Sequence, residues 1–173
     1  NSTLKYVTIG NNVTEIGPNA FYYSSLKLLV IGHKVNTIDT DAFLACSNLK
    51  TVINLSSLSI SKGNSLYGNV AYYADWLYNV PGGIIDGDYI WSVADGVNTL
   101  AAYMGNATEL TLPANYNGED YRIGASAFSG YTTLTSVIIP DAVTAIGDNA
   151  FKDCTALANI SIGGGVTRID SDA

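Results

Sequence analysis

The spacing of apolar residues between Leu134 and Ala156 is the most informative feature of the sequence. The stretch reads LTSVIIPDAVTAIGDNAFKDCTA, and the chain repeats the same pattern after it. Earlier copies run from Leu4 to Phe21 and from Leu26 to Phe43, a third opens at Leu49 and loses the pattern, and others begin at Leu110 and Leu157. All four Phe residues lie in the Ala-Phe pair of a copy. Self-similarity at a fixed period predicts a repeat architecture.

Each copy predicts the same local structure. The Leu-x-x-Val-x-Ile segment alternates with period two, so we expect a short strand that buries Val and Ile. A Gly or Pro follows and favours a turn, and Val-x-x-Ile is expected to form a second buried rung on another side of the coil. The residues before Ala-Phe are preferred N-cap types, so we expect a short helical turn to begin at each pair. These residues are Asn19, Asp41, Ser126 and Asn149, together with Asp172, which precedes Ala173 at the same place in the last copy.

The full phrase resembles a known repeat. Leu-x-x-Val-x-Ile-Pro-x-x-Val-x-x-Ile-Gly-x-x-Ala-Phe-x-x-Cys is similar to the BspA-type, or Treponema pallidum-type, leucine-rich repeat. The resemblance implies a right-handed leucine-rich repeat solenoid of about six coils, with a parallel β-sheet on one face and short helical turns. It also implies a surface protein of gut or oral bacteria, because host-protein binding and adhesion are usual roles in this family.

We expect one repeat domain over residues 1–173 in three segments. These are N-terminal repeats at 4–54, an irregular insert at 55–106, and C-terminal repeats at 107–173 that stop within the last copy. In the insert, the helical spacing of Val70, Tyr73, Ala74 and Leu77 predicts a helix at about 69–79. Two alternating segments around Asp95-Gly96 predict a β-hairpin at about 89–104. Because the chain begins and ends inside repeats, we expect it to be a piece of a longer array.

Outward positions of the first three strands supply candidate ligand-binding residues. They are Lys5, Tyr6, Lys27, Leu28, Val30, Lys50 and Ile53. The three apolar members at 28, 30 and 53 are expected to form an exposed cluster of the kind at which partners dock. The three lysines are expected to stack beside it. They act either as a solubilising edge whose stems cover apolar surface or as a site for an acidic segment of a partner.

The insert is rich in aromatic side chains. Eight of the eighteen aromatic residues of the chain lie between residues 55 and 106. Trp and Tyr serve both cores and interfaces, since each combines apolar area with a polar group. The insert therefore holds either core packing or an exposed platform for glycan or protein contact, and the candidates for the platform are Tyr72, Trp76 and Tyr78.

Composition narrows the classes of function. The net charge is −7, from +1 over residues 1–54, −3 over 55–106 and −5 over 107–173. An acidic chain without a basic cluster argues against a nucleic-acid partner. No apolar run is long enough to span a bilayer, and no signal peptide is visible at Asn1. Apolar content of 47% is ample for a core.

Other candidate chemistry has simpler explanations. His33 lies in a Gly-His-Lys turn without other ligands at metal spacing, so we expect a surface residue. Cys46 and Cys154 share one phase of the repeat but lie several coils apart, beyond disulfide reach, so we expect two small buried apolar residues. Asp86-Gly-Asp88 and Asp170-Ser-Asp172 lack the run of ligands of a calcium loop. No cofactor is expected.

These patterns predict a non-enzymatic, extracellular or cell-surface module that binds a host protein, a bacterial surface protein or a glycoconjugate through its strand face. A structural spacer that displays another domain is the alternative. An enzymatic role would require a deep pocket with two converging carboxylates, such as the pair that glycoside hydrolysis uses, and no motif in the sequence indicates one.

Overall fold

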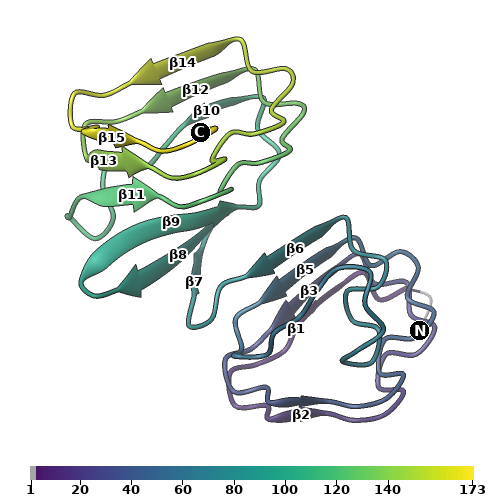
Figure 1. The fold of residues 1–173 in the computed structure, drawn as a ribbon. Helices are drawn as coiled ribbons and strands as arrows, with labels where there is room; N and C mark the ends of the chain where they lie inside the picture. The colour runs from purple at the N-terminus through teal and green to yellow at the C-terminus, as the bar shows by residue number, and fades with distance from the viewer. Residues whose placement is uncertain (1–2) are drawn as a thin grey trace. The chain divides into compact units, whose positions relative to one another are not determined.

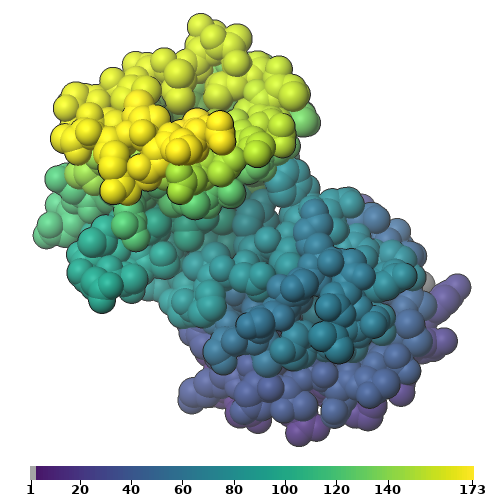
Figure 2. Space-filling view, in the orientation of Figure 1, coloured from purple at the N-terminus to yellow at the C-terminus, as the bar shows by residue number. Residues whose placement is uncertain are grey.

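The computed structural model describes residues 3–173, and it consists of short strands joined by turns. The chain divides into two compact units, Asn1–Gly82 and Gly83–Ala173. Each unit is a stack of coils whose equivalent strands run side by side in parallel, and unit 2 adds antiparallel strands at one edge (Figure 1). Successive coils lie directly against one another, and Figure 2 shows them as adjoining bands of colour within each unit.

Unit 1 has a four-stranded parallel sheet in the order β1-β3-β5-β6. Its strands are Tyr6–Thr8 (β1), Leu28–Ile31 (β3), Thr51–Asn54 (β5) and Trp76–Asn79 (β6). A second ladder pairs Glu15–Ile16 (β2) with Thr37–Ile38 (β4). The expected Val-x-x-Ile rung on another side of the coil is therefore present. Leu29, Ile31 and Val52 point inward and are fully buried, as the alternation along these strands predicts.

Unit 2 repeats this plan with two sheets. The first has the order β10-β12-β14, with bounds Glu109–Thr111, Ser136–Ile139 and Asn159–Ile162. The second has the order β15-β13-β11-β9-β8-β7. Its strands are Ile84–Asp86 (β7), Tyr89–Ala94 (β8), Val97–Tyr103 (β9), Tyr121–Ile123 (β11), Val143–Ile146 (β13) and Arg168–Ile169 (β15). β8 and β9 are antiparallel and form the hairpin expected around Asp95-Gly96, and β9 then pairs in parallel with β11.

The Ala-Phe pairs build a column of rings inside each unit. Phe21 stacks on Phe43 with ring centroids 5.0 Å apart and 10° between the planes. Phe128 stacks on Phe151 with the same distance and angle. The Phe ring of one coil thus packs on the Phe ring of the next coil, and such contacts between neighbouring repeats stabilise repeat proteins.

Both cysteines are free and buried, which confirms the expectation for them. The Cys46 thiol donates to the carbonyl oxygen of Phe21, one coil earlier, at 3.0 Å, and the Cys154 thiol donates to that of Phe128 at 3.0 Å. The two cysteines, each three residues after the Phe of an Ala-Phe pair, are therefore small buried side chains that also carry a weak donor.

The expected helical turns at the Ala-Phe pairs are wrong, because residues 3–173 contain no helix. The residues that were expected to cap helices, such as Asn19 and Asn149, have φ of 58° and 54°, which is the left-handed region. Asn and Asp tolerate this region better than most residues. Alternate N–H groups of the turn then leave the coil: that of Tyr22 donates to Asn19 O, whereas those of Phe21 and Tyr23 donate to the next coil. An α-helix would instead pair each of these N–H groups with a carbonyl oxygen four residues earlier in the same coil.

The expected helix at 69–79 is also wrong, because Trp76–Asn79 is strand β6 and extends the sheet of unit 1. Trp76, Leu77 and Tyr78 are all half-buried, and a pairing partner of four residues is available in β5. The Ala of the Ala-Phe pair is replaced in this coil by Gly68. A Cβ atom there would lie 2.4 Å from the carbonyl oxygen of Asp39, so the two coils approach too closely for any side chain.

Residues 55–82 lack the repeat pattern but complete a coil of unit 1, and the two compact units divide at Gly82–Gly83. Buried Asn54 organises this coil: its side-chain nitrogen donates to Leu58 O at 2.7 Å and to Asn79 Oδ1 at 2.8 Å. Asn79 lies beside Asn54 in the sheet and donates in turn to Ile60 O. These side-chain bonds satisfy the backbone of a turn that lacks the repeat pattern.

Candidate functional site

The outward positions of β1, β3, β5 and β6 form the strand face of unit 1. Parallel pairing in register aligns them in two columns. The first column contains Tyr6, Leu28, Thr51 and Trp76, and the second contains Thr8, Val30, Ile53 and Tyr78. Tyr6 is 68% exposed, while the other three members of the first column are half-buried. The strand face therefore presents its apolar and aromatic groups mainly along the first column.

The expected exposed cluster of Leu28, Val30 and Ile53 is wrong for two of its members. Val30 is 6% exposed and Ile53 is 1% exposed, and only Leu28 is partly accessible. Both buried residues lie on the inner strands of the sheet, where each side chain has neighbours on both sides, and Ile53 lies between Val30 and the larger Tyr78. A partner that touches this face would contact the first column, not Ile53.

The three lysines do stack, as expected. The Lys27 N–H donates to Lys5 O at 2.7 Å, and the Lys50 N–H donates to Lys27 O at 3.1 Å. The lysine column, Lys5, Lys27 and Lys50, is exposed along its length and lies one residue before the first column of the strand face. Asp75 occupies the next rung, where its N–H donates to Lys50 O. Within residues 3–173, the structure shows no carboxylate paired with any of these lysines.

The aromatic residues of the insert divide between core and surface. Trp91 and Tyr103 are 1% exposed and belong to the core of unit 2. Trp91 stacks on Tyr116 with ring centroids 4.2 Å apart. Tyr72 is 47% exposed and packs edge-on against Tyr73. Trp91 and Tyr103 of the insert therefore pack in the core, whereas Tyr72 lies at the surface.

The sequence predicted a helix at Trp76 and Tyr78, but both residues lie in strand β6. As strand residues two apart they share one side of β6, with rings nearly parallel at 6° and centroids 6.4 Å apart. They therefore extend the strand face, while Tyr72 lies on a turn before β6 and is separate from them. The consecutive apolar and aromatic residues Trp76, Leu77 and Tyr78, followed by Pro81-Gly82, were the signal that favoured a strand.

Burial raises the pKa of several side chains above their ordinary values. Burial raises the pKa of Tyr121, whose hydroxyl donates to Pro113 O at 2.7 Å. It also raises the pKa of Tyr89 and that of the Cys154 thiol. The Cys154 thiol is therefore kept neutral, which disfavours nucleophilic chemistry.

Candidates for metal binding find no support in the described part of the chain. His33 is exposed in its turn, as expected. Among residues 3–173, no group of three or more His, Cys, Asp or Glu side chains is placed to hold a metal ion. No helix of those residues is long and apolar enough to cross a membrane.

The coil geometry and the repeat pattern agree with one family. The family model for the BspA type leucine rich repeat region matches residues 1–72 and 101–173 in six copies. More than half of the chain is matched, so this chain belongs to the BspA-type leucine-rich repeat family. The stretch outside the match, residues 73–100, holds β6, β7, β8 and the start of β9, and the antiparallel pairing of β7, β8 and β9 departs from the regular coil.

Solved structures of bacterial leucine-rich repeat proteins are similar to parts or most of the chain. The T. pallidum leucine rich repeat protein is 26% identical over 50% of this chain and 42% of its own, with a TM-score of 0.46. A leucine-rich repeat protein from Bacteroides capillosus is 29% identical over 51% of this chain and 71% of its own, with a TM-score of 0.45. A leucine rich cell surface protein from Faecalibacterium prausnitzii is 23% identical over 95% of this chain and 43% of its own, with a TM-score of 0.49.

The chain spans less than half the length of the T. pallidum and F. prausnitzii proteins. No curated protein matches it.

Proposed function

We propose that this chain is a non-enzymatic, extracellular or cell-surface binding module, and that unit 1 engages an acidic partner protein through the strand face and the lysine column. The observation that supports this most directly is the alignment of Lys5, Lys27 and Lys50 beside Tyr6 and Leu28. Three like charges on adjacent rungs repel one another modestly in salt water. An acidic partner segment would relieve that repulsion, and the neighbouring aromatic column supplies apolar contact.

The coil itself does not require lysine at this position. The equivalent rungs of unit 2 hold Thr108, Thr135 and Ala158, which are joined by the same backbone bonds of 2.7 Å and 3.0 Å. The column is therefore a feature of unit 1 alone and not of the repeat. Unit 1 carries a net charge of +1 and unit 2 one of −8, so the long-range repulsion of an extended acidic protein is weaker at unit 1.

Membership of the family supports a surface location. One similar solved structure is described as a cell surface protein, and the family is typical of bacterial surface proteins and interaction modules. These relationships concern the family and its members, and they make adhesion or partner binding the natural proposal for this chain.

The test is binding of the full chain to a panel of host matrix proteins and bacterial surface proteins, in low and in physiological salt. The Lys27→Glu/Lys50→Glu variant should lose binding, and Tyr6→Ser should weaken it, because both act on exposed positions. A matched control, Lys34→Glu/Lys152→Glu, makes the same change of net charge away from the strand face. Equal loss in both double variants would mean that only overall charge matters.

A chain that binds no member of the panel would favour the alternative role, a spacer that displays another domain. An Asp substitution at Ile53 is unsuitable for this test, because that side chain is buried and a carboxylate there would unfold the coil.

A further inference from the structure

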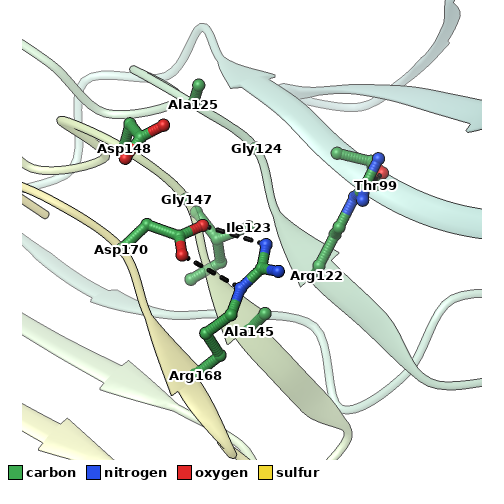
Figure 3. A pocket seen from close by; sticks show the side chains of 10 residues that line it. All are labelled: Thr99, Arg122, Ile123, Gly124, Ala125, Ala145, Gly147, Asp148, Arg168 and Asp170. Atoms are coloured by element: carbon green, nitrogen blue, oxygen red, sulfur yellow. Dashed lines mark hydrogen bonds and ion pairs between the residues drawn. The ribbon is translucent and has the colours of Figure 1, made fainter.

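A cavity of about 230 Å³ lies on the second sheet of unit 2, on the side of β11, β13 and β15 that faces away from the core. Figure 3 shows Arg122 and Thr99 on one side of this cavity, and Asp148 and Asp170 on the other. The cavity belongs to unit 2 alone and is separate from the strand face of unit 1.

The register of the sheet explains why the cavity exists. Arg122 pairs with Thr99 on one side and with Ala145 on the other, and Ala145 pairs with Arg168. Two arginines thus occupy one outward column with a single alanine between them. Gly124 and Gly147 also line the cavity, and a Cβ atom at either would meet the adjacent coil, 3.1 Å from Leu100 O and 2.8 Å from Ala125 N respectively. Because Ala145 is short and the arginines on both sides of it are long, a hollow forms between the two arginines. Its floor consists of backbone atoms and the methyl group of Ala145.

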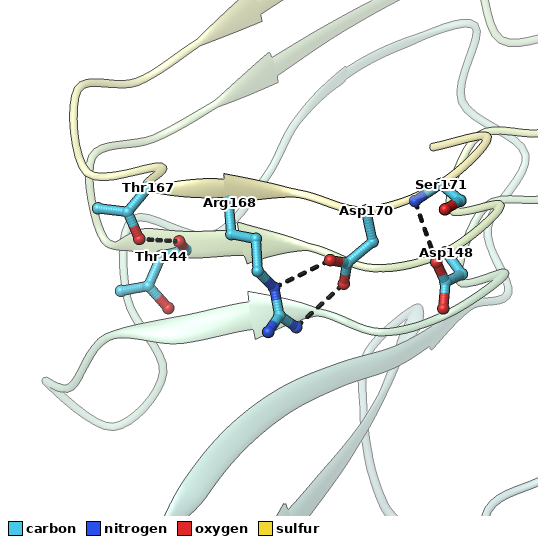
Figure 4. A network of polar contacts seen from close by, with 6 residues as sticks. All are labelled: Thr144, Asp148, Thr167, Arg168, Asp170 and Ser171. Atoms are coloured by element: carbon cyan, nitrogen blue, oxygen red, sulfur yellow. Dashed lines mark hydrogen bonds and ion pairs between the residues drawn. The ribbon is translucent and has the colours of Figure 1, made fainter.

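The two arginines differ in their partners. Arg168 forms a two-pronged pair with Asp170, from Nε at 2.9 Å and from Nη2 at 3.0 Å (Figure 4). Arg122 is half-buried, and its Nε donates to the neutral Thr99 hydroxyl at 2.8 Å. No carboxylate within residues 3–173 pairs with Arg122. A partly buried guanidinium without a counter-charge is costly, and its planar fork matches a carboxylate.

The opposite wall carries acceptors. The Asp170 side chain is 25% exposed beside its arginine. Asp148 accepts the Ser171 N–H through Oδ1 at 3.0 Å, and each carboxylate has further lone pairs available. A ligand that places a carboxylate at Arg122 must therefore offer donors, and not a second negative group, towards Asp148 and Asp170.

We propose that this cavity binds the carboxylated sugar unit of an acidic glycan, with the sugar carboxylate on the free nitrogens of Arg122 and its hydroxyls on Asp148 and Asp170. A sugar acid combines one carboxylate with several hydroxyl donors on a small ring. An acidic peptide side chain has the carboxylate but no hydroxyls, and its nearest donors are backbone N–H groups, so it matches the two aspartates less well than a sugar acid does. The short Ala145 side chain and the backbone of Gly124 and Gly147 line the cavity where the ring would lie.

The experiment is a titration of the full chain with glucuronate, galacturonate and N-acetylneuraminate, followed through the backbone amide signals of Gly124 and Gly147. Glucose and galactose are the neutral controls, and glutamate is the control for a carboxylate without a sugar ring. We expect saturable shifts at these glycines with at least one acidic sugar. The Arg122→Gln variant should bind it about tenfold to a hundredfold more weakly, as expected for loss of a charge-assisted hydrogen bond.

Two further variants separate the cavity from overall charge. Ala145→Leu fills the floor without a change of charge and should abolish the shifts, while Lys152→Gln removes an exposed base elsewhere in unit 2 and should leave them intact. Equal binding of neutral sugars or of glutamate would overturn the assignment. So would the absence of shifts with all three acids, or shifts that survive both Arg122→Gln and Ala145→Leu in folded protein. None of these results bears on the strand face.

Discussion

Phe128 stacks on Phe151, one coil later, with ring centroids 5.0 Å apart and 10° between the ring planes. Phe128 is fully buried and also contacts Tyr103 and Tyr131. Phe151 is 9% exposed. The inner ring of this pair therefore has contacts on more sides than the outer one.

We expect Phe128→Ala to lower the free energy of unfolding by about 3–5 kcal/mol, the cost of a cavity in place of a buried Phe. Phe151→Ala should cost less, because its ring has fewer neighbours. Urea denaturation of both variants measures the difference. An equal loss of unfolding free energy in the two variants would show that the number of neighbours around each ring does not set the cost of removing it.

Substitutions at Asn149 distinguish two reasons for a polar residue before Ala-Phe, a left-handed backbone conformation and a helix cap. Its φ of 54° predicts that Asn149→Ala costs about 1 kcal/mol through left-handed backbone strain. Asn149→Gly should then keep wild-type stability, since Gly adopts this region freely. A role as helix cap predicts the reverse order, with Ser preserving stability better than Gly. Urea denaturation of the three variants decides between them.

Gly68 and Gly63 form a matched pair for the close approach of coils. Both have positive φ, at 61° and 68°, so an Ala at either position carries similar strain. A Cβ at Gly68 would meet backbone atoms of the adjacent coil, whereas nothing lies within 4 Å of one at Gly63. Gly68→Ala should therefore lower the free energy of unfolding by about 1–3 kcal/mol more than Gly63→Ala, as overpacking does. Thermal melts of similar midpoint would contradict the close contact.

Stability should fall at alkaline pH. Burial raises the pKa of the Cys154 thiol above its ordinary value of 9.0 and that of the Tyr121 hydroxyl above 10.0. The folded chain thus holds these protons more tightly than the unfolded chain does. Their contribution is complete below pH 9.0 and is lost as the pH rises through the folded pKa values.

The free energy of unfolding, measured by denaturation at a series of pH values above neutrality, should decline from about pH 9 upward. Cys154→Ser removes the thiol but keeps a donor for the Phe128 carbonyl, so the first part of the decline should disappear in that variant. An unchanged profile would assign the whole decline to the tyrosines.

Where the repeat is regular, the local pattern of apolar residues was sufficient to predict the strands. The alternation in segments such as Val137 to Ile139 placed the strands, and the spacing to Ile146 placed the second rung, because period-two burial depends only on neighbouring residues. The phase of Cys46 and Cys154 likewise placed both thiols inside. The column of Lys5, Lys27 and Lys50 followed from the repeat length alone.

Contacts between coils decided the rest. Trp76 and Tyr78 lie in a strand because β5 offers a partner, and the residues before Ala-Phe adopt left-handed φ because alternate N–H groups bond the next coil. Burial of Val30 and Ile53 depends on neighbours across the sheet, and the cavity between Arg122 and Arg168 depends on Ala145 lying between them. The sequence by itself determined the coil and its period. Only the tertiary structure decided which outward positions are exposed, because that depends on side chains from other coils.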